Sequence, residues 1–358
     1  LTTLLQSPEG LAGKKNPNNF AAILQRFFDL GRVDEGGLDV ASYFMFALEL
    51  RLQNDRFMAA LNKVIEDGVL PIPPDGKEVV GQHLARVGSE RFPELHSSTP
   101  FTWFADSWRK LCSEEWVNAL PPRRWTDWAG CVLRLAVGFG VLWESRWYQE
   151  IGKGAIDRSL SLEAPEIARR IASEPIFTWF QDSVRPQDKN QIRKYRSVIA
   201  QGAAVKKLLI DREMHSIELT EEEIALHWRS DDVATNLLRE FNRTWSSVIS
   251  TSSSERASYG KTAQHRSDAV ESSLEIRRDD DYYGLLRKVG PSRARSSYID
   301  PLPEALAVIS GLAASGPDVG CAVGDVRREL RSLGVQVGSV ELVDALERAG
   351  LATRVADA

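Results

Sequence analysis

The stretch AGCVLRLAVGFGVLW, from Ala129 to Trp143, is the most apolar run in the chain and decides the fold class. It is about 15 residues long with Arg134 in its middle, short of the roughly 20 apolar residues that a membrane-spanning helix needs. We therefore expect a buried helix here. Seven of the ten tryptophans lie between Trp103 and Trp147, around this run, so the largest part of the core should form at this place.

The N-terminal end predicts half of a winged helix. Apolar residues recur at helical spacing from Asn18 to Leu30, and Gly31 suits the end of that helix. Arg32 to Val40 then predicts a short hairpin with its turn at Gly36 and Gly37. Helix, glycine and hairpin follow one another as in the second half of a winged helix. Two further helical stretches are expected between Asp39 and Gly68.

The C-terminal end predicts a second winged-helix-like module. Three short helices are expected over Pro303–Leu312, Val323–Leu333 and Ser339–Ala349, followed by a β-rich tail over Leu351–Val355. The third helix would enter a DNA groove, and it carries three carboxylates, which oppose contact with phosphate. These acidic residues are Glu341, Asp344 and Glu347. Protein contact or dimerisation is therefore favoured over DNA reading for this module.

One seven-residue motif occurs twice. FTWFADS at Phe101–Ser107 returns as FTWFQDS at Phe177–Ser183, each time after a serine and a proline. A Ser or Thr cap followed by proline in the first turn is typical of a helix start. Both copies are therefore predicted to begin helices that present a Phe/Trp/Phe face. Duplication of a helical unit and two helices that serve one aromatic core are both compatible with the repeat.

A basic stretch is the best candidate for nucleic-acid contact, and it lies within a long helix expected from Pro186 to His215. Its cations face one acidic residue, Asp188, and its tyrosine is placed to stack on a base. The candidate residues are Arg185, Lys189, Arg193, Lys194, Tyr195, Arg196, Lys206 and Lys207. The alternative is a helix whose charged side pairs with acidic neighbours elsewhere in the fold.

Composition and length divide the chain into four parts. With 358 residues it exceeds the usual size of a single domain. We expect an N-terminal winged-helix-like module in 1–72 and a Trp-rich helical core with the basic helix in 73–245. A Ser-rich and charged linker is expected in 246–300, and the C-terminal winged-helix module in 301–358. The fold class predicted for the whole is mainly α.

No catalytic or metal-binding pattern occurs in the sequence. The P-loop, H-E-x-x-H and G-x-S-x-G motifs are absent, and the five histidines are scattered. The three cysteines form no C-x-x-C pair, which favours a reducing compartment. The densest acidic group, Glu275 with 279–281, is interrupted by two arginines and indicates a self-paired charge run. Catalytic residues, cofactors and metals are therefore predicted to be none, and an unrecognised nuclease is the least favoured alternative.

Charge and targeting signals limit the classes of partner and compartment. A net charge of −5 does not fit a bulk polyanion binder. Neither a signal peptide nor a membrane span is predicted, so we expect a cytoplasmic protein without membrane contact. The first residue is Leu1, which fits either a fragment or a non-standard start codon.

The segment RRWTDWAGCVLRLAVGFGVLWE, from Arg123 to Glu144, places an Asp-Trp pair before a glycine-bearing apolar helix. With the winged-helix-like ends, it resembles accessory proteins of bacterial anti-phage defence gene clusters, including those built around modified DNA. The resemblance implies a subunit of a complex that detects or restricts foreign DNA. The leading hypothesis is a non-enzymatic adaptor whose partners are other protein subunits. The alternative is a DNA-binding regulator that uses the basic helix.

Overall fold

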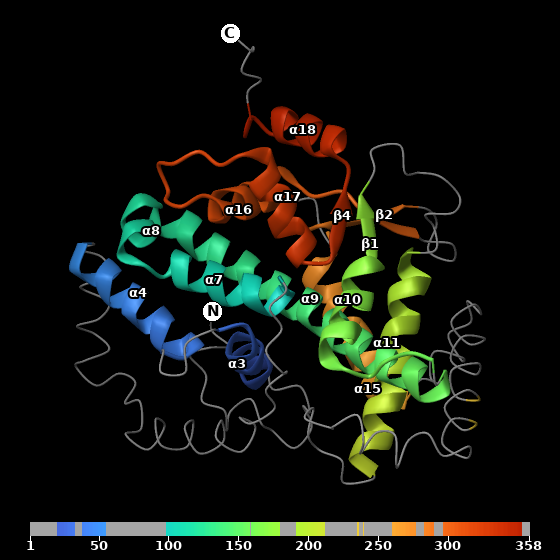
Figure 1. Cartoon of the computed structure of the whole chain (residues 1–358). Coiled ribbons are helices and arrows are strands. Elements are labelled where there is room, and N and C mark those ends of the chain that lie inside the picture. The colour runs from blue at the N-terminus through green and yellow to red at the C-terminus, as the bar shows by residue number, and fades with distance from the viewer. Residues whose placement is uncertain are drawn as a thin grey trace, which may run out of the picture.

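The computed structural model describes residues 20–32, 38–54, 98–157, 159–179, 191–211, 235, 239, 260–276, 283–289 and 296–352. These residues are mainly helical, as expected from the sequence. At their centre lies one long helix, α9 (Pro122–Ile156), and helices from both halves of the chain pack around it (Figure 1).

Helix α9 is 35 residues long and contains the whole apolar run. It starts with Pro122 in its first turn, where the missing N–H has no intrahelical partner to lose. Nearly every residue from Trp128 to Ala155 is buried, because neighbours cover the helix on all sides. The prediction of a buried helix is confirmed. Among the described helices, none combines the length and the hydropathy that crossing a bilayer requires.

Two helices from the N-terminal part pack beside α7 (Pro100–Leu111) and α8 (Glu114–Ala119). The first, α3 (Phe20–Gly31), agrees with the helix predicted there. The second, α4 (Val40–Asn54), begins at the residue where the hairpin was expected to end.

The hairpin prediction is therefore wrong at Val40, and 33–37 lie outside the described residues. The Asp39 carboxylate explains the helix start, because its Oδ1 accepts the Ser42 N–H at 2.6 Å, a typical N-cap contact. The Val40 N–H is also satisfied, since it donates to Gln25 Oε1 of α3 at 3.0 Å.

The two copies of the repeated motif fold differently. The first forms α7, capped by Thr99 rather than Ser98: the Thr99 hydroxyl accepts the Thr102 N–H at 3.2 Å. The first three residues of the second copy form strand β1 (Phe177–Trp179), so the prediction of a helix that begins there is wrong, and 180–183 lie outside the described residues. The strand is stabilised by parallel pairing with β4 (Val335–Val337), a tertiary contact that local sequence does not reveal.

Three helices cover the opposite side of α9: α10 (Ala164–Ser173), α11 (Gln191–Asp211) and α15 (Gly260–Leu274). Helix α11 approaches α9 closely, since a Cβ added at Gly202 would lie 2.2 Å from the Ser145 carbonyl oxygen.

Helix α15 and two paired strands, β2 (Leu286–Val289) and β3 (Ser296–Ile299), lie within the segment 246–300 that was predicted as a linker. That prediction is therefore wrong for 260–274, 286–289 and 296–299. Three buried side chains of α15, Ala263, Val270 and Leu274, explain the difference, because they anchor an otherwise polar helix. Leu274 lies against Gly138 of α9. Residues 246–259 lie outside the described part of the chain.

The C-terminal part contains the three predicted helices and a strand between the second and third. The elements are β2 (Leu286–Val289), β3 (Ser296–Ile299), α16 (Pro303–Ala313), α17 (Val323–Ser332), β4 and α18 (Ser339–Arg348). Strands β2 and β3 pair antiparallel. Gly334 and Gly350 follow α17 and α18 with φ of +83° and +69°, which glycine adopts without strain. Strand β4 pairs with β1 of the core, and 353–358 lie outside the described residues, so the winged-helix assignment stays a prediction.

The tryptophan-rich region forms the core, as the sequence predicts. Trp143 stacks on Trp147 with ring centroids 5.3 Å apart, and Trp125 stacks on Phe44 of α4 at 5.7 Å. The Trp125 indole N–H also donates to the Leu111 carbonyl at 2.7 Å, so a buried polar group is satisfied. These contacts join α4, α7 and α9 into one packed unit.

Candidate functional site

The basic helix α11 is the site that the sequence singles out, and its aromatic residue lies inside the fold. Tyr195 is 0 % exposed, and its hydroxyl donates to Glu271 Oε1 of α15 at 3.2 Å. Burial, and then the charge of Glu271, raise the pKa of Tyr195 well above its ordinary value. A buried ring is not accessible to a nucleic-acid base, so the prediction that Tyr195 stacks on a base is wrong.

Two cations of the same helix form ion pairs within the fold. The Arg196 guanidinium donates its Nε–H to Glu271 at 2.9 Å. The Lys206 ammonium lies 3.2 Å from Glu144 Oε1 and 5.2 Å from the centre of the Tyr148 ring. These contacts agree with the alternative reading, in which the charged side of the helix pairs with acidic neighbours.

The remaining five candidates are not tested by these contacts. Arg185 and Lys189 lie outside the described residues. Arg193, Lys194 and Lys207 belong to α11, and their side chains lie outside the described part. Nucleic-acid contact by these five stays a prediction.

Glu144 of α9, beside the Trp-rich apolar run, is a charged centre whose partners the sequence does not reveal. The residue is 1 % exposed, and three cations from three other helices surround its carboxylate. Arg26 of α3 lies at 2.6 Å, Arg266 of α15 at 3.1 Å and Lys206 of α11 at 3.2 Å. Burial alone would raise the pKa of Glu144, but attraction by the three cations lowers it well below the ordinary value. The carboxylate therefore stays charged, and its ion pairs join four helices: α3, α9, α11 and α15.

A second carboxylate of α9, Glu150, has a similar environment. Its oxygens lie 3.2 Å from Arg146 and 2.7 Å from Lys153, both of α9, and 2.9 Å from Arg170 of α10. Arg146 also pairs with Glu174 beyond the end of α10. A glutamate inside a Trp-rich apolar run was the only sequence signal for such a centre. Both centres are built as structural ion pairs, but only Arg170 links Glu150 to another helix, whereas all three cations around Glu144 come from other helices.

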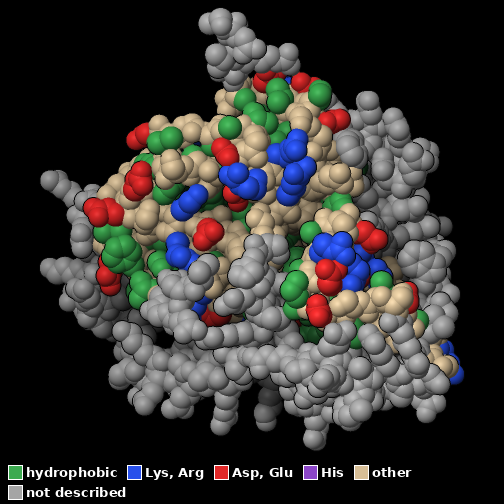
Figure 2. All heavy atoms as spheres, in the orientation of Figure 1, with side chains coloured by type: hydrophobic (Ala, Val, Ile, Leu, Met, Phe, Trp, Pro, Cys, Tyr) green, Lys and Arg blue, Asp and Glu red, His purple; other side chains and the backbone are tan. Residues whose placement is uncertain are grey.

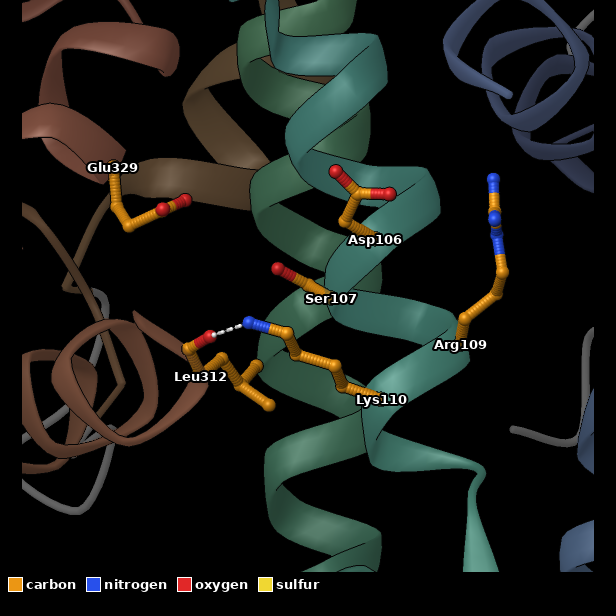
Figure 3. Close-up of a pocket in the computed structure, with 6 residues that line it drawn as sticks. All are labelled: Asp106, Ser107, Arg109, Lys110, Leu312 and Glu329. Atoms are coloured by element: carbon orange, nitrogen blue, oxygen red, sulfur yellow. Dashed lines mark hydrogen bonds between the residues drawn. The ribbon is translucent and has the colours of Figure 1, made fainter. Parts of the chain in front are cut away.

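A pocket of about 300 Å³ lies between α7, α16 and α17. Figure 3 shows that Ser107 and Lys110 reach from α7 toward α16, that Glu329 reaches from α17 toward α7, and that Arg109 points away from both. The lining residues are Asp106, Ser107, Arg109, Lys110, Leu312 and Glu329. The pocket was not predicted, although Asp106 and Ser107 end the first copy of the repeated motif.

Lys110 joins the pocket to the end of α16. Its ammonium donates to the carbonyl oxygens of Leu312 at 2.8 Å and of Ala314 at 3.3 Å. A cation is favourable there, because the last carbonyls of a helix have no intrahelical partner and carry partial negative charge. The C-terminal part is thus attached to the core by Lys110 as well as by the β1–β4 pair.

Within the part of the chain that the structure describes, no three His, Cys, Asp or Glu side chains converge on a point where they could bind a metal ion. Glu275, from the acidic group considered for a nuclease, is 3 % exposed. The other members of that group, 279–281, lie outside the described residues.

Comparisons of the chain with known protein families, with curated proteins and with solved structures found no match.

Proposed function

We propose that the protein is a non-enzymatic adaptor, an accessory subunit that contacts other proteins of a bacterial anti-phage defence complex acting on or near DNA. The outer face of α18 carries the proposal. Val340 is 70 % exposed, and Asp344 and Glu347 follow it by four and seven residues, so the three share one face of the helix. Leu342 and Leu346 are buried on the other side.

The chemistry of this face favours a protein partner. Hydrophobic and acidic side chains lie together over α18 at the top of the molecule (Figure 2). Leu351, 42 % exposed, follows the helix and extends the apolar part. The carboxylates of Asp344 and Glu347 on α18 oppose the approach of phosphate. The complementary surface is an apolar patch bordered by Lys and Arg, on another protein subunit.

The attachment of α18 to the core supports an adaptor role. The helix follows β4, and β4 is paired with β1, so a partner bound to α18 is held relative to the aromatic core. A second pair of exposed apolar side chains, Met45 and Phe46, lies on α4 at a different edge of the molecule (Figure 1). Two such surfaces on one core suit a subunit that joins two others.

The test is co-expression with each protein encoded beside the gene, followed by co-purification and measurement of affinity. A Val340→Arg change is expected to weaken the complex at least tenfold, because it places a charge in the apolar centre of the contact. The matched control is Val319→Arg, since Val319 is 52 % exposed and lies in the loop before α17.

Two results would contradict the proposal. One is a chain that stays alone with every neighbouring protein. The other is a complex that the two arginine variants weaken equally. A duplex-DNA mobility shift that Arg193→Ala and Lys194→Ala abolish would favour the DNA-binding regulator instead.

A further inference from the structure

We propose that the charged cluster around Glu150, between α9 and α10, binds one small anion, which accepts hydrogen bonds from Arg146 and Arg170. The accepting atom is a halide ion or one oxygen of a small oxyanion. The site does not require the adaptor role proposed above.

The cluster holds more positive than negative charge. Glu150 Oε1 lies 2.7 Å from Lys153 and 3.2 Å from Arg146, and Glu150 Oε2 lies 2.9 Å from Arg170. Glu174, which pairs with Arg146, is the second carboxylate. Within the described residues the three cations have no other acidic partner within 4.0 Å. Three positive and two negative charges therefore leave one positive charge in excess.

Burial makes this excess charge costly. Arg146 is 3 % exposed and Glu150 is also buried, so little water can solvate the centre of the cluster. A charge in such a place raises the free energy of the folded state unless an opposite charge neutralises it. One bound anion supplies the missing negative charge.

Two N–H donors of the cluster are buried without a hydrogen-bond partner. These donors are Arg146 Nε and Arg170 Nη2. In a guanidinium, Nε–H and one Nη2 N–H lie along the same edge. Arg170 directs this edge to Glu150 through Nε, and Arg146 directs the same edge to Glu150 through Nη2. Each arginine thus brings one unused donor to the same carboxylate, and a single acceptor atom can satisfy both.

The two guanidiniums are held in place by their other nitrogens. Arg146 Nη1 donates to Gln149 at 2.8 Å, and Gln149 in turn donates to Gln201 of α11. Arg170 Nη1 donates to the Ser161 carbonyl at 2.9 Å. Because the donors are oriented before an anion arrives, binding costs little conformational entropy.

The cluster reaches the surface on one side. Lys153 is half-buried, and the Glu174 side chain is 61 % exposed. Figure 2 shows Lys and Arg side chains beside carboxylates at the surface over α10. A small ion can therefore enter from solvent when these two side chains move.

The experiment is a chloride titration of the full chain, followed by the line width of the chloride NMR signal. Sodium gluconate keeps the ionic strength constant, because gluconate is too large for a buried cluster. Chloride bound to a slowly tumbling protein relaxes fast, so the signal broadens with occupancy. The expected Kd is about 10 mM or tighter, since two charge-assisted hydrogen bonds form away from water.

Inorganic phosphate is then added as a competitor. Narrowing of the chloride signal by phosphate would show that the site also accepts oxyanions. A signal that phosphate leaves broad would assign the site to halide ions.

Two variants change the charge of the site in opposite directions. Arg170→Gln removes a donor and the excess charge, and it should weaken chloride binding at least tenfold. Glu174→Gln removes a negative charge from an exposed side chain, and it should strengthen binding severalfold. Arg169→Gln is the matched control, because Arg169 lies on the surface of α10 and pairs with Glu166, and it should leave the affinity unchanged. Thermal unfolding of each variant confirms that it folds.

Three outcomes would overturn the site. The first is a chloride signal no broader with the native protein than with Arg170→Gln, which would mean that water satisfies the two donors. The second is equal weakening by Arg169→Gln and Arg170→Gln, which would mean general attraction to surface charge. The third is an affinity that Glu174→Gln leaves unchanged or lowers.

Discussion

Replacing Glu144 by glutamine keeps the size of the side chain and removes its charge. In the native protein this carboxylate is 1 % exposed and lies 2.6 to 3.2 Å from Arg26, Arg266 and Lys206. The variant leaves three cations grouped around a neutral amide, with little water to solvate them. Their mutual repulsion and lost attraction both destabilise the folded state.

The expected loss of unfolding free energy is about 3–5 kcal/mol, the range for removing one partner of a buried ion pair. That loss is a large part of the roughly 5–15 kcal/mol that stabilises an ordinary domain. Glu166→Gln is the matched control. Glu166 pairs with Arg169 on the surface, where the two side chains are 38 % and 74 % exposed, and such pairs contribute about 0.2–1 kcal/mol.

Urea unfolding followed by tryptophan fluorescence measures both variants, because the core tryptophans become exposed together. The difference should also depend on pH. The pKa of Glu144 is lowered on folding, so its charge stabilises the native state fully above its ordinary pKa of 4.5. That stabilisation declines as the pH falls through the lowered value. The gap between the native protein and Glu144→Gln should therefore narrow in acid below pH 4.5.

Either of two results would refute this reasoning. One is a loss in Glu144→Gln no greater than that in Glu166→Gln. The other is a gap that stays constant from neutral pH into acid.

Three smaller changes test other contacts. Gly202→Ala should destabilise the protein by about 1–3 kcal/mol, because the added Cβ would lie 2.2 Å from a carbonyl oxygen of α9. In the same urea assay the control Gly324→Ala should be neutral or slightly stabilising, because no atom lies within 4 Å of its added Cβ. Equal losses would mean that α11 can shift away from α9. Lys110→Met should lower the free energy of unfolding by about 1 kcal/mol through the lost carbonyl contacts, and an unchanged urea midpoint would count against the attachment of α16. In an Ellman titration of the native protein, one thiol should react, that of the half-buried Cys321. Burial raises the pKa of Cys112 and keeps this thiol unreactive until urea is added. Rapid reaction of all thiols would contradict the packing.

Helices with a clear apolar period could be predicted from the sequence. These features have local causes, namely periodicity, capping and positive φ. They include the apolar run of α9, the three C-terminal helices and the glycines that follow α17 and α18. The core position of the tryptophans also follows from composition, because large apolar rings seldom stay exposed in number.

The two copies of the repeated motif adopt different structures, because a strand distant in the sequence pairs with the second copy. Phe177–Trp179 repeats the letters of a helix start, and it became a strand because β4 offers it a parallel partner. The segment 260–274 has a polar composition, and it docks as α15 through three buried side chains and the ion pairs of Arg266 and Glu271. Neither partner lies near its segment in the sequence, so local propensity could not reveal the result.

The candidate site was harder to predict than the fold. A basic run reads the same whether its cations face solvent or face Glu144 and Glu271, because the carboxylates belong to other helices. The pocket beside Ser107 likewise combines α7 with α17, far apart in the chain. Only the arrangement of the helices distinguishes these cases.

The β1–β4 pair affects how the chain folds during its synthesis. Phe177 and Trp179 are buried in the finished protein, and their strand has no partner until the ribosome has made Val335–Val337. For that interval the nascent chain carries an apolar strand with an open edge, a form that favours chaperone binding and aggregation. Pairing of β1 should therefore follow the emergence of β4 from the exit tunnel.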